Sequence, residues 1–213
     1  MTSKVLVYDH PTLAAYQRHA EAAIAEWRRI HSPSQFLRRF AGTLRRGARV
    51  LDYGCGIGTD LAWLRRTGFQ IEGLDGTPIF IREARRRCPG VPIWLARFEQ
   101  ARLSPARYDG IWCQAALIHV TPEELRRQLG KLRVALKPGG WLGLTLAWGR
   151  AKGLTDHDWI PGRYVAGYSK AEAAAFVEQE SWDIHHLAVV SHDGRQGRWI
   201  HLLASLRCST MPA

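Results

Sequence analysis

A glycine-rich turn with flanking carboxylates is the part of the sequence best suited to chemistry. In "VLDYGCGIGTD" an apolar run ends in an aspartate, and a glycine then stands at every second position. Glycine tolerates positive φ angles and lets backbone N–H groups approach a ligand closely. A turn of this kind between a strand and a helix binds phosphates or nucleotide-like cofactors. The residues expected to line it are Asp52, Gly54, Cys55, Gly56, Gly58 and Asp60.

The spacing within this turn separates two classes of cofactor. The dinucleotide pattern G-x-G-x-x-G needs its third glycine one residue after Gly58, where this chain has Thr59. Asp52 would repel a bound pyrophosphate, but it would attract a ligand that carries an ammonium and a sulfonium group. The local charge therefore favours S-adenosylmethionine over NAD, and an NAD-dependent oxidoreductase is the disfavoured alternative.

Acidic residues after the next two apolar runs fit the same cofactor. Asp75, with Gly76 beside it, ends "IEGLD" at the place where a carboxylate commonly accepts hydrogen bonds from ribose hydroxyls. Its alternative role is to cap the following helix, which the sequence assigns to Thr77. In "ARFEQ", Phe98 is expected to pack on adenine and Glu99 to accept from its amino group. The alternative for Glu99 is a solvated loop acid.

Alternating elements must position these residues. From Arg49 onward, five short apolar runs alternate with helical patterns, which predicts an α/β fold with a parallel sheet covered by helices on both faces. The clearest helix, "TPEELRRQLGKLRVALKPGG", starts with a capping box from Thr121 to Glu124 and should end at Pro138. The last two apolar runs are joined only by a turn, so they should pair antiparallel as an edge hairpin. The runs read as strands are "ARVLDYG", "FQIEGLD", "VPIWLARF", "YDGIWCQ", "WLGLTLAW", "WDIHHLAVV" and "GRWIHLLASL".

The 213 residues are expected to form a single domain. Residues 1–48 hold one long amphipathic helix, "HPTLAAYQRHAEAAIAEWRRI", and a second helix, "SPSQFLRRFAGTL", which together predict a helical cap. Residues 49–147 form the cofactor-binding half. Residues 149–169 are long for a connection between a strand and a helix, which indicates a substrate lid. Residues 170–213 supply the C-terminal helix and hairpin.

Four motifs, taken in order, resemble one known family. "VLDYGCGIGTD", "GLDGTPIFIREAR", "YDGIWCQAALIHV" and "ALKPGGWLGLTL" look like the class I S-adenosylmethionine-dependent methyltransferases, over about Arg49 to Ala147. The resemblance implies a Rossmann-like, doubly wound, seven-stranded sheet in which the last strand inserts antiparallel. It also implies that the glycine turn surrounds the methionine part of the cofactor, and that Cys113 and Gln114 lie beneath the sulfonium. The product would be S-adenosylhomocysteine.

The sequence also offers candidates for the surroundings of the methyl acceptor. His119, just after the fourth strand, is the candidate general base, with a structural histidine packed under the cofactor as the alternative. The lid and the cap carry aromatic side chains suited to a flat or apolar small molecule. Asp156, His157 and Asp158 are adjacent and point in different directions, so no metal site is expected. The expected substrate-binding residues are Tyr16, Trp27, Trp148, Trp159, Arg163, Tyr164 and Tyr168.

Charge and composition set the competing hypotheses. The formal charge of +11 comes mostly from scattered arginine pairs, which read as a solvated surface. The leading hypothesis is a methyltransferase that acts on a small molecule in secondary metabolism or detoxification. Its alternatives are an RNA or protein methyltransferase and a non-catalytic cofactor-binding domain. No Asn/Asp-Pro-Pro-aromatic motif follows the fourth strand and no RNA-binding module is evident, so a nucleic-acid substrate is disfavoured. The acceptor atom (O, N or S) and the oligomeric state stay open.

The cellular setting follows from what the sequence lacks. Its four cysteines form no CxxC pair and read as reduced and mostly buried. There is no apolar run long enough to span a membrane, and the first residues lack the long apolar region of a secretory signal. A cytoplasmic protein is expected.

Overall fold

The computed structural model describes residues 10–29, 32–149, 152–156, 159–191 and 197–207. After the N-terminal helices, most strands between residues 49 and 148 are separated by helices, as expected for an α/β fold. The helices are α2 (Pro11–Arg18), α3 (Ala20–Arg28), α4 (Gln35–Gly42), α5 (Thr59–Arg66), α6 (Pro78–Arg87), the 3₁₀ helix η1 (Leu117–His119), α7 (Pro122–Ala135) and α8 (Lys170–Glu178). The strands are β1 (Arg49–Tyr53), β2 (Gln70–Asp75), β3 (Ile93–Leu95), β4 (Tyr108–Gln114), β5 (Leu136–Trp148), β6 (Gly153–Leu154), β7 (Tyr164–Val165), β8 (Gly167–Tyr168), β9 (Trp182–Ser191) and β10 (Arg198–Leu206).

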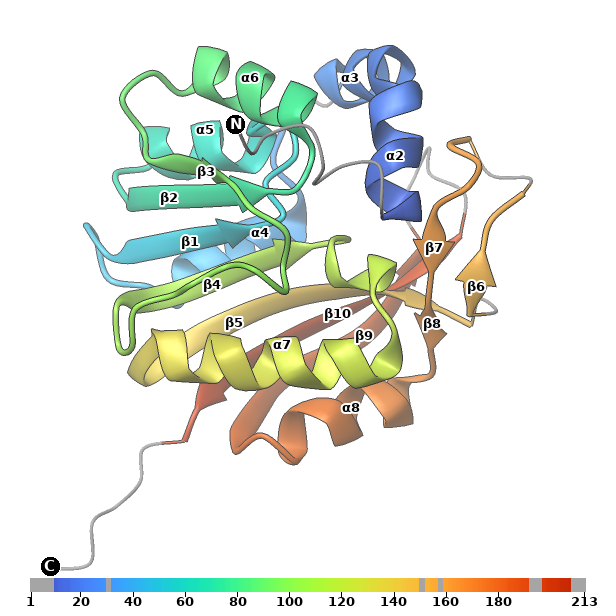
Figure 1. Ribbon diagram of the computed structural model, residues 1–213. Coiled ribbons are helices and arrows are strands. Elements are labelled where there is room, and N and C mark those ends of the chain that lie inside the picture. Colours follow the sequence, from blue (N-terminus) through green and yellow to red (C-terminus); the bar gives the residue numbers. More distant parts are fainter. Residues whose placement is uncertain (1–9, 30–31, 150–151, 157–158, 192–196, 208–213) are drawn as a thin grey trace, which may run out of the picture.

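One twisted sheet organises the molecule (Figure 1). Its strand order is β3-β2-β1-β4-β5-β10-β9, and the short β8 pairs with the end of β5. The first five strands are parallel, whereas β10 is antiparallel to both β5 and β9. The chain winds away in both directions from β1 and β4, which makes the gap between them the topological switch point where such sheets bind ligands. The predicted doubly wound sheet with an inserted antiparallel strand is therefore confirmed.

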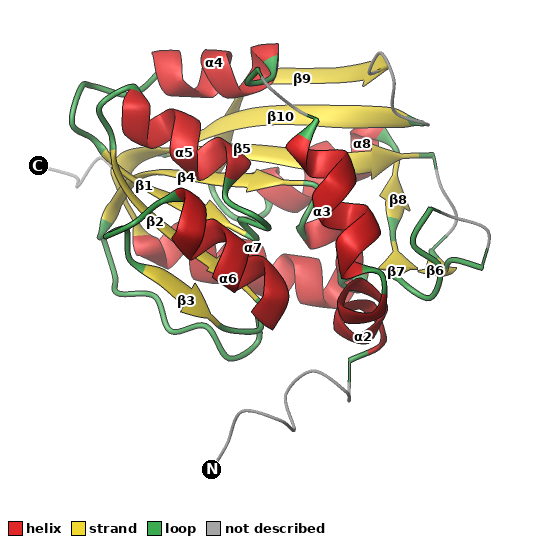
Figure 2. Cartoon of the chain, turned by 90° about the horizontal axis from the view of Figure 1, so that it is seen from above, coloured by secondary structure: helices red, strands yellow, loops and turns green. Residues whose placement is uncertain are grey.

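Both faces of the sheet are buried under helices. On one face α7 and α8 contribute Leu125, Leu129 and Val177 to the larger core. On the other face lie α4, α5 and α6, which follow one another along the sheet in Figure 2. Successive strand residues point to opposite faces, so Val50 packs under the second group and Leu51 under the first.

The expected cap is only partly correct. Helix α4 packs on the sheet, because Phe36 and Phe40 each lie 5.2 Å from the Trp112 ring. The long first helix is instead two helices, since His19 leaves the helical conformation with φ −105° and ψ 23°. Figures 1 and 2 both place α2 and α3 beyond the carboxyl ends of the parallel strands. Only these two helices form the cap.

The ends of two elements also differ from the sequence prediction. Helix α7 ends at Ala135, and the segment "LKPGG" already belongs to β5. Lys137 precedes a proline, a position that disfavours helix and favours extended backbone. Strand β3 is short, because pairing with β2 ends at Leu95. Phe98 and Glu99 therefore lie on the loop after β3 rather than at the end of the strand.

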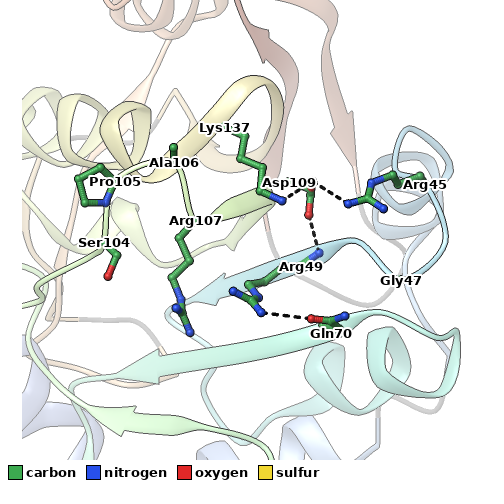
Figure 3. A pocket seen from close by; sticks show the side chains of 10 residues that line it. All are labelled: Arg45, Gly47, Arg49, Gln70, Ser104, Pro105, Ala106, Arg107, Asp109 and Lys137. Carbon is green, nitrogen blue, oxygen red and sulfur yellow. Dashed lines mark hydrogen bonds and ion pairs between the residues drawn. The ribbon is translucent and has the colours of Figure 1, made fainter.

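A network of ion pairs holds the amino ends of the strands together (Figure 3). Asp109 of β4 accepts hydrogen bonds from the Arg49 backbone N–H and from Lys137 Nζ, both at 2.8 Å, and lies 3.6 Å from Arg45. Burial raises the pKa of the Asp109 carboxyl, but the bonds from Lys137 and Arg49 outweigh burial and lower it below its usual value. Some of the protein's basic residues therefore have a structural role at the amino ends of the strands. These residues surround a cavity of about 440 Å³.

The segment from residue 149 to 169 has some regular structure of its own. Strands β6 and β7 pair antiparallel, and β8 joins the main sheet at Trp148. The Ala166 N–H donates to the Ile118 carbonyl at 2.8 Å, which ties the segment to η1. Within the described ranges, no helix combines the length and the apolar character needed to cross a bilayer.

Candidate active site

A cavity of about 1160 Å³ opens at the carboxyl ends of the parallel strands. Its floor comes from the turn after β1, the end of β2, the loop after β3 and the end of β4. Its walls come from the two cap helices and from the segment before α8. It thus lies at the switch point that the strand order defines. Of the residues predicted from sequence, it is lined by Asp52, Gly54, Cys55, Gly56, Asp60, Asp75, Gly76, Phe98, Glu99, Gln114, His119, Tyr16, Trp27, Trp159 and Arg163.

The turn after β1 needs glycine for steric reasons. Gly54 has φ +88°, and a Cβ atom there would lie 2.3 Å from the Ala116 Cβ. The N–H groups of Gly54 and Cys55 both donate to the Leu74 carbonyl at 2.9 Å, so the turn stays attached to β2. This close backbone packing leaves room for a ligand above the turn.

Three carboxylates make the floor of the cavity strongly acidic. Asp52 is 3% exposed, and its Oδ2 atom has no hydrogen-bond partner among the residues that the structure describes. Burial raises the pKa of Asp52 well above its usual value, and the nearby charges of Asp60 and Asp75 raise it further. Asp60 itself accepts a hydrogen bond from Trp112 Nε1 at 2.8 Å. An oxygen acceptor without a partner, facing this cavity, suits a cationic ligand.

Asp75 connects the turn to the start of α6. Its Oδ2 accepts from the Gly56 N–H at 3.0 Å and its Oδ1 from the Thr77 N–H at 2.8 Å. Thr77 is the N-cap residue of α6, as predicted, although its side chain makes no capping bond. Burial raises the pKa of Asp75 in spite of these hydrogen bonds. Each carboxylate oxygen can accept a further bond, which leaves capacity for ribose hydroxyls.

The residues expected at adenine lie side by side along the loop after β3. The Phe98 ring stacks on Tyr53 at 4.7 Å with an interplanar angle of 23°. Glu99 lines the same part of the cavity, 3.5 Å from Arg97 and 4.0 Å from His10. A fixed aromatic face with a carboxylate next to it can hold a planar base that carries an amino group.

A hydrogen-bonded chain crosses the wall opposite this floor. His119 Nε2 lies 2.9 Å from the Tyr16 hydroxyl, and His119 Nδ1 lies 2.8 Å from the Tyr164 carbonyl oxygen. Arg163 Nη1 donates to the same Tyr16 hydroxyl at 2.8 Å. The chain joins the cap, the 3₁₀ helix after β4 and the segment before α8, which are far apart in sequence.

Comparisons with known proteins agree with this geometry. Residues 50–140 match the family described as "Methyltransferase domain". Over that stretch, which is less than half of the chain, the protein is similar to the class I S-adenosylmethionine-dependent methyltransferases. The chain is 34% identical over 101 residues to the malonyl-[acyl-carrier protein] O-methyltransferase of Enterobacter lignolyticus, and 38% identical over 104 residues to the trans-aconitate 2-methyltransferase of Methylobacterium nodulans. The matches cover 47% and 46% of this chain but only 39% and 38% of those relatives, so the chain spans about two fifths of their length.

A solved structure extends the likeness of fold to nearly the whole chain. It is the 1,6-didemethyltoxoflavin-N1-methyltransferase of Burkholderia thailandensis with bound 1,6-didemethyltoxoflavin and S-adenosylhomocysteine. The TM-score is 0.69 at 19% identity, and the match covers 91% of this chain and 88% of that one. The sheet and the helices that cover it therefore follow a known fold.

The cofactor of this family is S-adenosylmethionine, and the residues present fit it. The buried Asp52 Oδ2 without a partner is a site for a positively charged group. The turn at Gly54 admits no Cβ and leaves its backbone open to the ligand. Within the described residues, no group of three His, Cys, Asp or Glu side chains is placed to hold a metal ion. His157 and Asp158 of the candidate considered from sequence lie outside those residues.

Two of the predicted cofactor residues do not line the cavity. Cys113 is fully buried in the core on the far side of β4, because neighbouring strand residues point to opposite faces and Gln114 takes the cavity side. Gly58 is the N-cap of α5 with φ +76°, and a Cβ atom there would lie 3.1 Å from Ala84. Its role is the close packing of α5 on α6.

Three of the predicted substrate residues also lie elsewhere. Trp148 and Tyr168 face a separate hollow beyond β5, with the Arg198 guanidinium 4.5 Å from the Trp148 ring centre. Both residues lie outside the main cavity because β8 pairs with the end of β5. Tyr164 packs its ring against the core and contributes only backbone, through its carbonyl to His119.

Several lining residues carried no sequence signal. Ala115, directly after β4, has φ +51°, which is strained for a residue with a side chain and is typical of functional sites. Phe80 of α6 and Trp199 of β10 reach the cavity from elements whose local pattern shows only burial. Arg97 could have been found, since it directly precedes Phe98.

Proposed function

We propose that this protein transfers a methyl group from S-adenosylmethionine to a small-molecule acceptor. The observation that carries the proposal is one continuous cavity with two chemically different ends. One end is the acidic floor formed by Asp52, Asp60 and Asp75. The other end is enclosed by aromatic side chains of the cap and of the segment before α8. The volume of about 1160 Å³ is large for a single ligand and suits a cofactor together with an acceptor.

The aromatic end has a defined shape. Trp27 lies between Phe80 at 4.9 Å and Trp159 at 6.2 Å, measured between ring centres. Tyr16 lies 5.9 Å from Trp27 and 5.5 Å from Phe80. Such a set of rings binds a flat or apolar molecule and excludes water from it. Rings that gather within one cavity favour a small molecule over a nucleic acid or a folded protein.

The chain's own residues would hold and orient both ligands. Asp52 attracts the charged part of the cofactor, Asp75 accepts from the ribose hydroxyls, and Phe98 and Glu99 contact the adenine. When bound, the cofactor supplies a methyl group already activated for displacement by its sulfonium. The protein then has to fix the acceptor atom in line with that methyl group, and positioning of this kind can remove about 7–11 kcal/mol of a barrier.

Titration calorimetry with S-adenosylhomocysteine tests the cofactor half of the proposal. We expect binding by the wild-type protein and a loss of affinity in Asp75→Asn. The matched control is Asp183→Asn, because Asp183 is an exposed acid on β9 that pairs with Arg207. No binding by the wild-type protein would contradict the proposal.

A methyl-transfer assay tests the second half. Formation of S-adenosylhomocysteine is measured with phenols, carboxylic acids and amines as candidate acceptors. The named relatives act on malonyl-[acyl-carrier protein] and trans-aconitate, so carboxylic acids belong in the set. Tight cofactor binding with no transfer to any of the three classes would favour a non-catalytic binding domain.

A further inference from the structure

The Tyr16 hydroxyl is held from two sides at the edge of the cavity. His119 Nε2 lies 2.9 Å from it and Arg163 Nη1 lies 2.8 Å from it. All three side chains are buried, with exposed fractions of 9%, 9% and 5% for Tyr16, His119 and Arg163. All three residues also line the cavity, as do the aromatic residues Trp27, Phe80 and Trp159.

The second nitrogen of His119 fixes the direction of these hydrogen bonds. His119 Nδ1 lies 2.8 Å from the Tyr164 carbonyl oxygen, which can only accept. The hydrogen of a neutral imidazole is therefore on Nδ1, and Nε2 accepts from the Tyr16 hydroxyl. Because an arginine can only donate, Arg163 donates to the Tyr16 oxygen. Tyr16 is thus a donor to His119 and an acceptor from Arg163.

This direction changes the expected role of His119. With Nε2 bonded to Tyr16 and Nδ1 bonded to Tyr164, His119 reaches an acceptor only through the Tyr16 hydroxyl. The Tyr16 oxygen can accept a second hydrogen bond beside that from Arg163. The positive charge of Arg163, 5.3 Å from the ring centre of Tyr16, stabilises negative charge that develops on that oxygen.

We propose that the acceptor is a phenol-type hydroxyl compound, that Tyr16 removes its proton, and that His119 receives the Tyr16 proton in turn. The proposal rests on the methyl-transfer function proposed above. The acceptor O–H proton passes to the Tyr16 oxygen while the Tyr16 proton passes to His119 Nε2. The acceptor oxygen then forms the new bond to the methyl carbon as the bond from that carbon to sulfur breaks. His119, now an imidazolium, releases its proton to solvent when the product leaves.

The shape of the site favours this acceptor class. Trp27, Phe80 and Trp159 offer ring faces to a planar body, and Tyr16 stands where that body would present a polar group. A carboxylate acceptor arrives without a proton at the acceptor oxygen, so a proton relay would have nothing to accept. Tyr16 is accordingly the catalytic residue, whereas His119 and Arg163 act through it as positioning residues.

Binding of 4-nitrophenol to protein saturated with S-adenosylhomocysteine tests the proton transfer without any turnover. The pH is set below the pKa of free 4-nitrophenol, where the free compound is mostly colourless. We expect the wild-type protein to convert bound 4-nitrophenol to its yellow phenolate. Tyr16→Phe should abolish the colour, and so should His119→Gln, whose amide oxygen accepts from Tyr16 but takes up no proton. Tyr168→Phe is the matched control, since Tyr168 lies outside the cavity and should keep the colour.

A turnover measurement completes the test. We expect Tyr16→Phe to lower methyl transfer to unsubstituted phenol by about 10²–10⁴-fold, the usual range for loss of a general base. Transfer to a phenol that is already ionised at the assay pH should fall much less. An equal loss on both phenols would indicate a structural role for Tyr16 and would overturn the proposal.

The remaining outcomes are also decisive. No binding of 4-nitrophenol, a colourless bound form in the wild-type protein, or persistent colour in His119→Gln each contradicts the relay. Tighter binding of benzoate than of 4-nitrophenol, lost in Arg163→Lys, would indicate a carboxylate acceptor instead. If the relay is contradicted but the wild-type protein still binds S-adenosylhomocysteine in calorimetry, the proposed function is unaffected. If the wild-type protein does not bind S-adenosylhomocysteine, the proposed function itself is wrong.

Discussion

Replacing Asp52 by asparagine should stabilise the cofactor-free protein and weaken cofactor binding. Asp52 is buried beside two other carboxylates, and its Oδ2 has no partner in the described part of the chain. A buried polar group left unsatisfied costs about 1–3 kcal/mol, and most of that cost is removed when the charge is removed. For a domain of this size such a gain corresponds to a rise of roughly 2–10 °C in Tm.

The same substitution should cost affinity for the cofactor. Losing one charge-assisted contact to the cationic ligand removes about 1.5–3 kcal/mol, which raises Kd by roughly 10- to 100-fold. Urea denaturation without cofactor measures the first effect, and titration calorimetry with S-adenosylmethionine measures the second. Asp183→Asn, at an exposed acid 53% accessible to solvent, should change neither quantity.

The pH dependence of the stability difference between Asp52→Asn and the wild-type protein is the sharpest test of this reasoning. The folded protein holds the Asp52 proton more tightly than the unfolded chain, because burial and two neighbouring charges raise the pKa of this carboxyl. Its contribution to stability is therefore most favourable in acid and is lost as pH rises from the ordinary carboxyl pKa to the raised one. Asp52→Asn should gain stability at roughly pH 8 and gain little at roughly pH 4. If Asp52→Asn is less stable than the wild-type protein at the higher pH, or gains the same stability at both pH values, the ionised Asp52 carboxylate does not destabilise the folded protein.

Three further outcomes are expected. Gly54→Ala should lose about 2–5 kcal/mol of unfolding free energy in urea, because of the positive φ angle and the clash with Ala116. The control Gly68→Ala, where φ is +94° and the space is open, should lose only about 1–2 kcal/mol. Equal losses in the two variants would contradict the steric explanation. Asp75→Asn should weaken binding of S-adenosylhomocysteine by roughly 10- to 100-fold in calorimetry, and unchanged affinity would exclude a ribose contact. Asp109→Asn should destabilise the protein near neutral pH but have less effect as pH falls through the lowered folded pKa of Asp109, which thermal melts at several pH values would reveal.

Features encoded in neighbouring residues could be predicted from the sequence. Strand β4 has the predicted bounds, and Thr121 and Ser169 cap α7 and α8 as their capping-box patterns indicate. The glycine turn and the acids at the carboxyl ends of β1 and β2 meet at one edge because parallel strands end together. These signals are local, since each depends on residue types within a few positions.

Features that depend on distant contacts could not be predicted. The bond between Tyr16 and His119 joins residues 103 positions apart, and no pattern near either residue encodes it. The aromatic residues at the end of β5 and in the 149–169 segment read alike, yet the pairing of β8 with β5 directs Trp148 and Tyr168 away from the cavity. The place of Thr77 at the N-cap of α6 could be predicted, but the bond from its backbone N–H to Asp75 could not.

The position of β10 bears on how the chain is made. Strand β9 reaches the sheet only through β10, which lies between β9 and β5 although it comes later in the chain than both. While the ribosome is still adding β9, the backbone of β5 along Leu142, Leu144 and Leu146 has no neighbour on that side. An unpaired apolar edge of this kind invites pairing with other nascent chains. Synthesis of residues 198–206 closes that edge, so this short segment protects the growing protein from aggregation as well as completing its sheet.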